Sequence, residues 1–193
     1  MDRTALGAAV AAEHAAWQAL LAGLAEGRLD EPGLVGEWRV RDVLGHLAAW
    51  DRWQLVQLRC AFSGQVPGDD ELHGGITCPP STSMAEDAMN AMFVAGFAAE
   101  SVATVRRHFE DVGALRADWV ATATAEQLAE PVGPDWSGGT NRVLRLAREV
   151  PTVQDPGPAG AFVERQLAHL AEHRLAIEEA LAGTGAAADS GPP

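Results

Sequence analysis

The sequence predicts an all-α fold, a four-helix bundle, from three observations. Apolar residues recur at three- and four-residue steps over four long stretches. Glycines and prolines cluster between these stretches, where they stop helices. One connection is long enough to cross between helices that are not neighbours. Our first interpretation is therefore an antiparallel four-helix bundle with one long crossover loop.

The first two helices are expected over residues 4–25 and 40–62. Gly27 ends the first helix, and the loop that follows holds Pro32 and Gly36, which block helix continuation. The apolar stripe of the first helix is Val10, Trp17, Leu20, Leu21 and Leu24. The stripe of the second helix is Val43, Leu44, Leu47, Trp50, Leu55 and Leu58.

The long crossover is expected over residues 63–83, which are rich in Gly, Pro and Ser. Ser83 and Glu86 form the S-x-x-E pattern of a capping box, so the third helix should begin there. Its apolar period continues to about residue 121, and Gly113 should weaken it locally.

The rest of the chain is expected to hold one more long helix. Thr124 and Gln127 suggest a second capping box that opens a short turn. Residues 131–158 read as irregular, around a short helix at residues 141–149, and the fourth helix is expected over residues 159–182. We therefore predict one domain over residues 1–183 and a disordered tail over residues 184–193, which has nothing to bury.

Composition narrows the class of function. The formal net charge is −13, and all 14 basic residues are arginine, so a phosphate-binding surface and a nucleic-acid partner are not expected. No apolar run approaches the length that crosses a bilayer, and the N-terminus does not read as a signal peptide. We expect a cytoplasmic protein with a small-molecule substrate and no membrane partner, and a homodimer is the assembly to test.

Two histidines lie four residues apart in the fourth predicted helix. At about 100° per residue, His169 and His173 fall within roughly 40° of each other on one face. They share a helix stripe with Phe162, Gln166 and Ile177, which should face the core, where an imidazole without a partner is costly. Two imidazoles so placed can bind one metal ion.

A third histidine, His46, lies in the second predicted helix among apolar neighbours, so it should point inward too. Three imidazoles would complete a facial set of nitrogens and leave positions open for water or substrate. A single inward histidine is more often a hydrogen-bonded core residue than a ligand, and the H-x-x-x-H spacing occurs often by chance. The other histidines are His14, His73 and His108, and all three are expected at the surface.

The segment HLAEH also reads as H-x-x-E-H, the inverted zincin pattern of some metallopeptidases, in which the glutamate is the general base. Those peptidases need a much larger chain and a distant carboxylate ligand, so the pattern is a poor match. Glu172 nevertheless falls at about −60° from His169, close enough to approach a bound water.

A family resemblance rests on these same segments. The stretch GEWRVRDVLGHLAAWDRW resembles the second-helix signature of the DinB-like superfamily: a Trp before the helix, an Asp at its start and a His inside it. HLAEHRLAIEEAL is similar to the family's last helix, with its ligand pair. AEDAMNAMFVAGF resembles the third-helix start of the ClbS/DfsB-like self-resistance branch, in which Asn90 matches an Asn. The resemblance covers residues 4–182 and implies a DinB-like four-helix bundle.

The sequence departs from relatives in two places. Arg39 stands where the family often has a Ser or Thr N-cap, so the second helix should begin less firmly. The N-terminal domain of mycothiol-dependent maleylpyruvate isomerase resembles this chain, but its last helix carries Glu then His, whereas both residues are His here. The chain also lacks the C-terminal domain of that isomerase, so we do not expect its exact activity.

The resemblance implies a metal-dependent reaction on a small electrophile by a thiol transferase or a hydrolase. His46, His169 and His173 would hold the ion, zinc first, with nickel or iron as alternatives, and the thiol co-substrate could be mycothiol. Glu172 is the candidate catalytic base. The candidate pocket walls for a co-substrate are Trp50, Trp53, Asn90 and Phe93. The candidates for orienting the imidazoles are Asp42, Asp51 and Glu164.

Two other functions stay open from the sequence. The chain could be a ClbS-like self-resistance protein that hydrolyses or sequesters a DNA-damaging natural product. It could also be a binding module whose histidines hold a structural ion.

Overall fold

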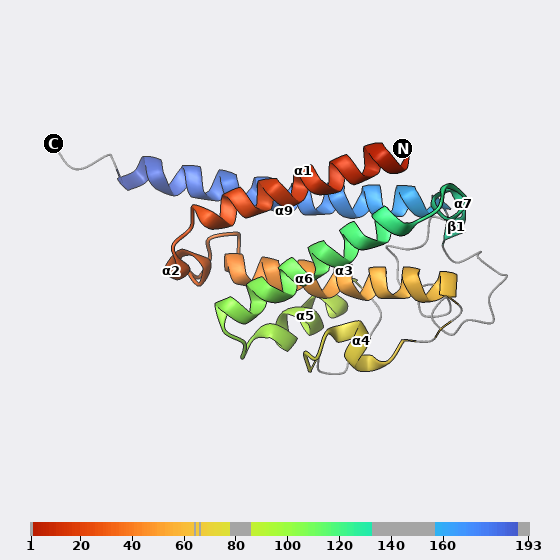
Figure 1. The fold of residues 1–193 in the computed structure, drawn as a ribbon. Helices are drawn as coiled ribbons and strands as arrows, with labels where there is room; N and C mark the ends of the chain where they lie inside the picture. The colour runs from red at the N-terminus through yellow and green to blue at the C-terminus, as the bar shows by residue number, and fades with distance from the viewer. Residues whose placement is uncertain (1, 64, 66, 78–85, 133–156, 189–193) are drawn as a thin grey trace.

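Four long helices dominate the computed structural model, which describes residues 2–63, 65, 67–77, 86–132 and 157–188 (Figure 1). The all-α prediction is confirmed. The long helices are α1 (Arg3–Ala22), α3 (Val40–Ser63), α6 (Val102–Thr122) and α9 (Ala159–Ala188). The short elements are α2 (Glu26–Leu29), α4 (Asp69–His73), α5 (Glu86–Phe97), α7 (Ala125–Ala129), β1 (Pro131–Val132) and β2 (Gly157–Pro158).

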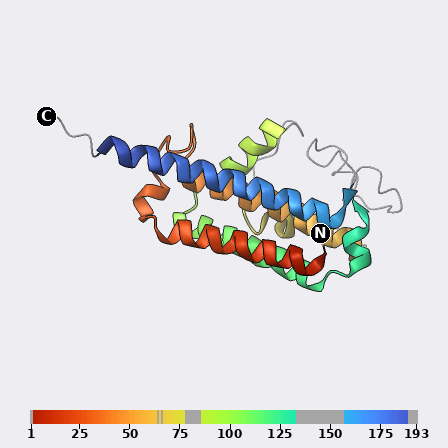
Figure 2. The same ribbon diagram turned by 90° about the horizontal axis from the view of Figure 1, so that it is seen from above.

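The directions of the long helices differ from the antiparallel first interpretation. Figures 1 and 2 show α3 and α6 running the same way, with α1 and α9 running the opposite way. The predicted crossover explains this arrangement, because the chain leaves α3 at one end of the bundle and begins α6 at the other. Helices α4 and α5 lie along the outside of α3 between these two points, and both contact α3.

The third predicted helix is two helices. The chain breaks after Phe97, and Ser101 opens α6 by accepting a hydrogen bond from the backbone N–H of Thr104 at 3.1 Å. An N-cap of this kind satisfies one of the donors that a helix start leaves unpaired. The prediction of one helix to residue 121 was therefore wrong over residues 98–101.

Capping accounts for the other helix starts. Asp2 accepts from the backbone N–H of Ala5, and Thr124 and Gln127 form the predicted capping box. At the start of α3, the Asp42 carboxylate accepts from the backbone N–H of Arg39 at 3.0 Å and from its guanidinium at 2.8 and 2.9 Å. Asp42 thus supplies one half of a capping box, the bond from the helix back to the N–H of Arg39, while Arg39 has no side-chain oxygen for the other half.

Several predictions fall at the edge of the described residues or outside them. The capping box of Ser83 and the short helix at residues 141–149 lie outside the described part of the chain, and so do residues 189–193. Helix α9 continues to Ala188, beyond the predicted end at residue 182. The division between a domain and a tail at residue 183 stays a prediction.

Close packing of α5 on α3 depends on a glycine next to the first candidate ligand. A Cβ on Gly45 would lie 3.1 Å from three atoms of the Phe97 side chain, so a larger residue would push the end of α5 outward. The two-residue strands β1 and β2 pair antiparallel, and the backbone N–H of Ala159 donates to the carbonyl of Glu130 at 2.9 Å. These bonds fix the start of α9 against α7.

Among the described helices, none is both long and apolar enough to span a bilayer.

Candidate metal centre

Three imidazoles from two helices converge inside the bundle. His46 comes from α3, while His169 and His173 lie one turn apart on α9. Their possible ligand nitrogens all lie within 4.8 Å of one another. The ring centroid of His46 lies 5.5 Å from that of His169 and 5.3 Å from that of His173. The structure therefore brings together the residues that the sequence selected as ligands.

The nitrogen geometry suits a single metal ion. The Nε2 atoms of His169 and His173 lie 3.0 Å apart. With metal–nitrogen distances of about 2.0–2.1 Å, two nitrogens bound to one ion at octahedral to tetrahedral angles lie about 2.9–3.4 Å apart. The pair on α9 thus fits a divalent ion in spacing, and all three residues fit it in donor chemistry. The separations that include His46 reach up to 4.8 Å, so a small movement of the rings would bring the third nitrogen to the ion.

The electrostatic surroundings keep the imidazoles in the form that binds metal. Burial lowers the pKa of His46 to about 3, with further lowering by His173 and His169. Burial also lowers the pKa of His173 to about 4, again with a contribution from His169, while the Glu172 carboxylate opposes the shift. Both rings are therefore neutral at pH 7, and a neutral imidazole has the lone pair that a metal ion needs.

Two of the three carboxylates that were expected to orient the imidazoles have other partners. Asp42 caps α3 through Arg39, and Asp51 forms a buried ion pair with Arg116 of α6. Burial raises the pKa of Asp51, while the positive charge of Arg116 opposes that shift. Neither residue orients an imidazole by a hydrogen bond, so this prediction was wrong for both. Glu164 is partly buried on α9, and its role stays a prediction.

The Nδ1 atom of His46 is buried and has no hydrogen-bond partner among the described residues. The indole ring of Trp38 lies against this imidazole, with the two ring centroids 5.1 Å apart. A ligating histidine usually donates its second nitrogen to a carboxylate or carbonyl. Here the aromatic ring, rather than a hydrogen bond, limits the rotation of the imidazole.

A cavity of about 500 Å³ opens beside the three histidines. It lies between α3 and α9, and α5 contributes one residue to its wall. The residues that line it are Trp38, His46, Trp50, Gln54, Asn90, Phe162, Arg165, Gln166, His169, Glu172 and His173. This volume is typical of small-molecule sites.

The four predicted pocket walls divide into two pairs. Trp50 and Asn90 line the cavity, and the Trp50 Nε1–H donates to Asn90 Oδ1 at 2.5 Å. Trp53 and Phe93 do not line it. Both are buried in the core and contact Trp50 edge-on, with ring centroids 6.0 and 5.1 Å away. They hold the Trp50 ring in place, and a direct role in binding has no support from their positions.

Glu172, the predicted catalytic base, lies on the rim of the cavity. It is exposed, lines the wall and precedes the ligand candidate His173. Its charge acts on that imidazole. The position is compatible with proton transfer to or from a molecule in the cavity, and the catalytic role stays a prediction.

Sequence reasoning assigned no site role to five lining residues: Trp38, Gln54, Phe162, Arg165 and Gln166. Spacing could have found two of them. Gln54 follows His46 by eight residues, and Arg165 precedes His169 by four, so each shares a helix face with a ligand candidate. Gln166 Nε2 donates to Gln54 Oε1 at 3.0 Å, which joins α9 to α3 at this end of the cavity.

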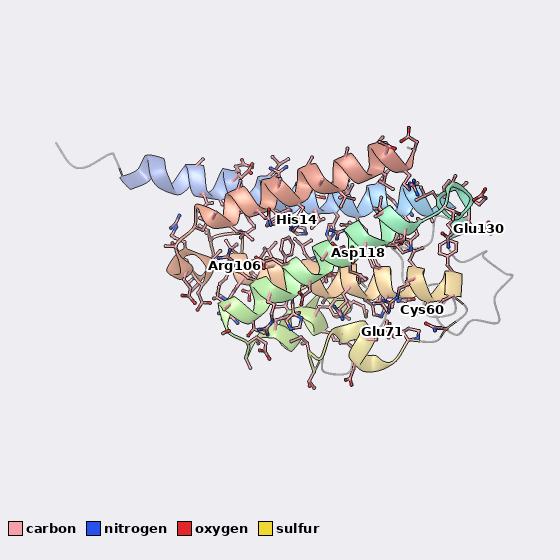
Figure 3. The ribbon with its side chains drawn as sticks, in the orientation of Figure 1. His14, Cys60, Glu71, Arg106, Asp118 and Glu130 are labelled. Atoms are coloured by element: carbon pink, nitrogen blue, oxygen red, sulfur yellow. The ribbon has the colours of Figure 1, made fainter. Side chains whose placement is uncertain are left out.

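The three remaining histidines line no part of this cavity, and each is partly buried rather than exposed. Figure 3 labels His14, which lies on α1 beside α6, near Gly113. His108 contacts Phe97 with ring centroids 5.4 Å apart, and His73 lies 6.4 Å from Phe93. Each of these rings packs on an aromatic side chain or against a helix. These contacts come from other elements of the fold, so the charged neighbours in sequence wrongly suggested that the rings are exposed.

Comparison with known proteins adds a family assignment for part of the chain. Residues 10–76 match the model of the mycothiol maleylpyruvate isomerase N-terminal domain, a DinB-like superfamily domain. The match agrees with the resemblance drawn from the sequence over these residues. The matched part contains His46 but not the pair on α9. No curated protein and no solved structure matched the chain.

Proposed function

We propose that this DinB-like protein is a metal-dependent enzyme that joins a thiol of the mycothiol type to a small electrophile, or hydrolyses such an electrophile. The observation that carries the proposal is the convergence of three imidazoles on the wall of a cavity of about 500 Å³. A buried structural ion would need no such cavity, because closed sites are filled by protein ligands.

Zinc is the first choice of ion, with nickel and iron as alternatives, because three imidazoles suit all of them. Bound there, a divalent ion would lower the pKa of a thiol or of water and so supply the nucleophile at neutral pH. His46, His169 and His173 would hold it, and the low pKa values of His46 and His173 keep them from competing with it for protons.

Glu172 would accept the proton that the nucleophile loses, a role supported by its place in the cavity lining next to His173. In the transfer reaction the thiol sulfur forms a bond to the electrophilic carbon with its own electron pair. The leaving group departs with the electrons of the broken bond, and the thiol proton passes to the Glu172 carboxylate. Trp38 and Trp50 form apolar walls that keep water from this path.

Metal analysis and turnover together test the proposal. Untagged protein is purified, its metal content is measured, and mycothiol is supplied with monobromobimane as the electrophile, which loses bromide. We expect about one ion per chain and thiol-dependent product. The His46→Ala variant should lose both, whereas His108→Ala, a partly buried histidine outside the cavity, should keep both.

Full turnover by protein shown to be metal-free would refute the proposal. Metal-dependent loss of bromide without any thiol would leave only its hydrolytic form. Metal binding with neither reaction would favour a binding module with a structural ion.

A further inference from the structure

Arg165 gives the histidine cavity a positive flank. It lies on α9 four residues before His169, is exposed and lines the cavity. Its guanidinium carbon lies 5.8 Å from the centroid of the Phe162 ring. Contact with an aromatic face restrains the planar guanidinium while leaving its N–H donors available.

The charge of Arg165 is not used within the described part of the protein. Several other buried or partly buried arginines there are paired with carboxylates, for example Arg116 with Asp51, and Arg174 with Glu13 and Glu178. For Arg165 the described residues provide no carboxylate within 4 Å. An arginine that is restrained at a cavity wall but lacks a partner is suited to bind an anionic group of a ligand.

The cavity is electrically polarised along α9. Arg165 stands on one side of His169, and the Glu172 carboxylate stands on the other. No other lysine or arginine lines the described cavity, so Arg165 is its permanent cation. A protein with a net charge of −13 repels anions at long range, which makes a local cation necessary for an anionic ligand.

A carboxamide pair completes this flank. Gln54 accepts a hydrogen bond from Gln166 through its Oε1, so the amide oxygen faces the neighbouring helix. Its NH₂ group has no partner among the described residues and can donate to a second oxygen of an anion held by Arg165. Arginine with an amide donor suits the planar, two-oxygen carboxylate.

Helix geometry sets the length of such a ligand. Residues four apart on a helix are separated by about 6 Å along its axis. A molecule with its carboxylate at Arg165 would therefore present to the histidines an atom about 5–7 Å away, roughly four to five bonds from the carboxylate carbon. We propose that Arg165 and Gln54 form a carboxylate subsite, and that one reactant is a short acid with its reacting atom at this distance. The inference rests on the proposed function for the identity of the reacting end.

Two probe pairs test the subsite separately from the metal chemistry. Zinc-loaded protein is titrated with 4-mercaptobutanoate and with its uncharged amide. Metal-free protein is titrated with butanoate and with butanamide, and the backbone amide resonances of residues 165 and 166 are followed by NMR. We expect each acid to bind about tenfold more tightly than its amide, the contribution of one charge-assisted hydrogen bond at a partly exposed site.

The Arg165→Met variant should remove this preference in both arms while its zinc content stays unchanged. Arg107→Met, an exposed arginine of α6 outside the cavity, is the matched control and should behave like the parent. Equal binding of acid and amide by the parent in the metal-free arm would overturn the subsite, and so would equal effects of the two variants. If zinc is not held but butanoate still prefers the parent over Arg165→Met, the subsite stands and the proposed metal chemistry fails.

Discussion

The buried ion pair between Asp51 and Arg116 joins α3 to α6, and breaking it should destabilise the bundle strongly. Only 2% of the Asp51 side chain and 6% of the Arg116 side chain are exposed. Replacing one partner leaves an uncompensated buried charge, which costs about 3–5 kcal/mol. We therefore expect Asp51→Leu and Arg116→Met each to lower the free energy of unfolding by about 3 kcal/mol or more.

The double variant separates loss of the pair from loss of packing. Helices α1, α6 and α9 surround the pair with mostly apolar side chains, and Glu13 and His14 are the polar ones. Leucine and methionine can fill this space, and replacing a buried pair by apolar residues of similar size is often neutral. The Nε of Arg116 also has no hydrogen-bond partner among the described residues, so part of its desolvation cost is not offset. We expect the double variant to be within about 1 kcal/mol of the parent.

Urea unfolding of the metal-free proteins, followed by circular dichroism at pH 7, is measured for the parent, the two single variants and the double variant, which together form a double-mutant cycle. The coupling free energy should be about 5 kcal/mol or more, because two single losses of about 3 kcal/mol would add to about 6 kcal/mol, whereas the double variant should lose about 1 kcal/mol at most. Additive losses, with the double variant least stable, would show that the pair is a weak contributor and that this reasoning about its burial is wrong.

Two further predictions concern the site. The pKa values of about 3 for His46 and about 4 for His173 lie below that of an exposed imidazole, so the unfolded chain takes up protons below pH 6.5 that the folded chain does not. Metal-free protein should therefore lose about 1–3 kcal/mol of unfolding free energy from pH 7 to pH 5. The His46→Gln variant should lose measurably less over the same range. Equal urea unfolding curves of the parent at both pH values would contradict this prediction. The Asn90→Ala variant removes the oxygen that accepts the hydrogen bond of the Trp50 indole, so it should lower the free energy of urea unfolding by about 1 kcal/mol. Its zinc content should be unchanged. A loss of zinc would contradict this expectation and show that the bond supports the ligands.

Local patterns predicted the helices well because capping and apolar period depend on neighbours in sequence. The break after Phe97 also had a local signal. Apolar residues step by four from Phe93 to Phe97, but the next step, to Val102, is five, and Ser101 stands there as an N-cap. The run AAE between them is compatible with a helix, which hid the break. The direction of α6 had no local signal, because a long connection can end at either end of a bundle.

The histidines of the site were predictable, but most of its walls were not. Imidazoles on an apolar face are unusual enough to stand out in sequence. Trp50 and Trp53 are both aromatic, buried and on α3, and only the position of α5 decides which one borders the cavity. Arg165 resembles any charged residue of a solvated helix face until Phe162 and the cavity are seen beside it.

Helix α9 shows how one segment can supply two kinds of chemistry. Its residues 162, 165, 166, 169, 172 and 173 line the cavity at steps of one and three. Because burial differs along this face, His173 has a lowered pKa and keeps its lone pair, while the exposed Arg165 and Glu172 contribute charges to the cavity. Imidazole donors together with two opposite charges on one helix face would hold an ion and orient a polar molecule over it. A shift of α9 by one residue against α3 would turn both sets away from His46, so the contacts between these helices are as important for the site as the ligands themselves.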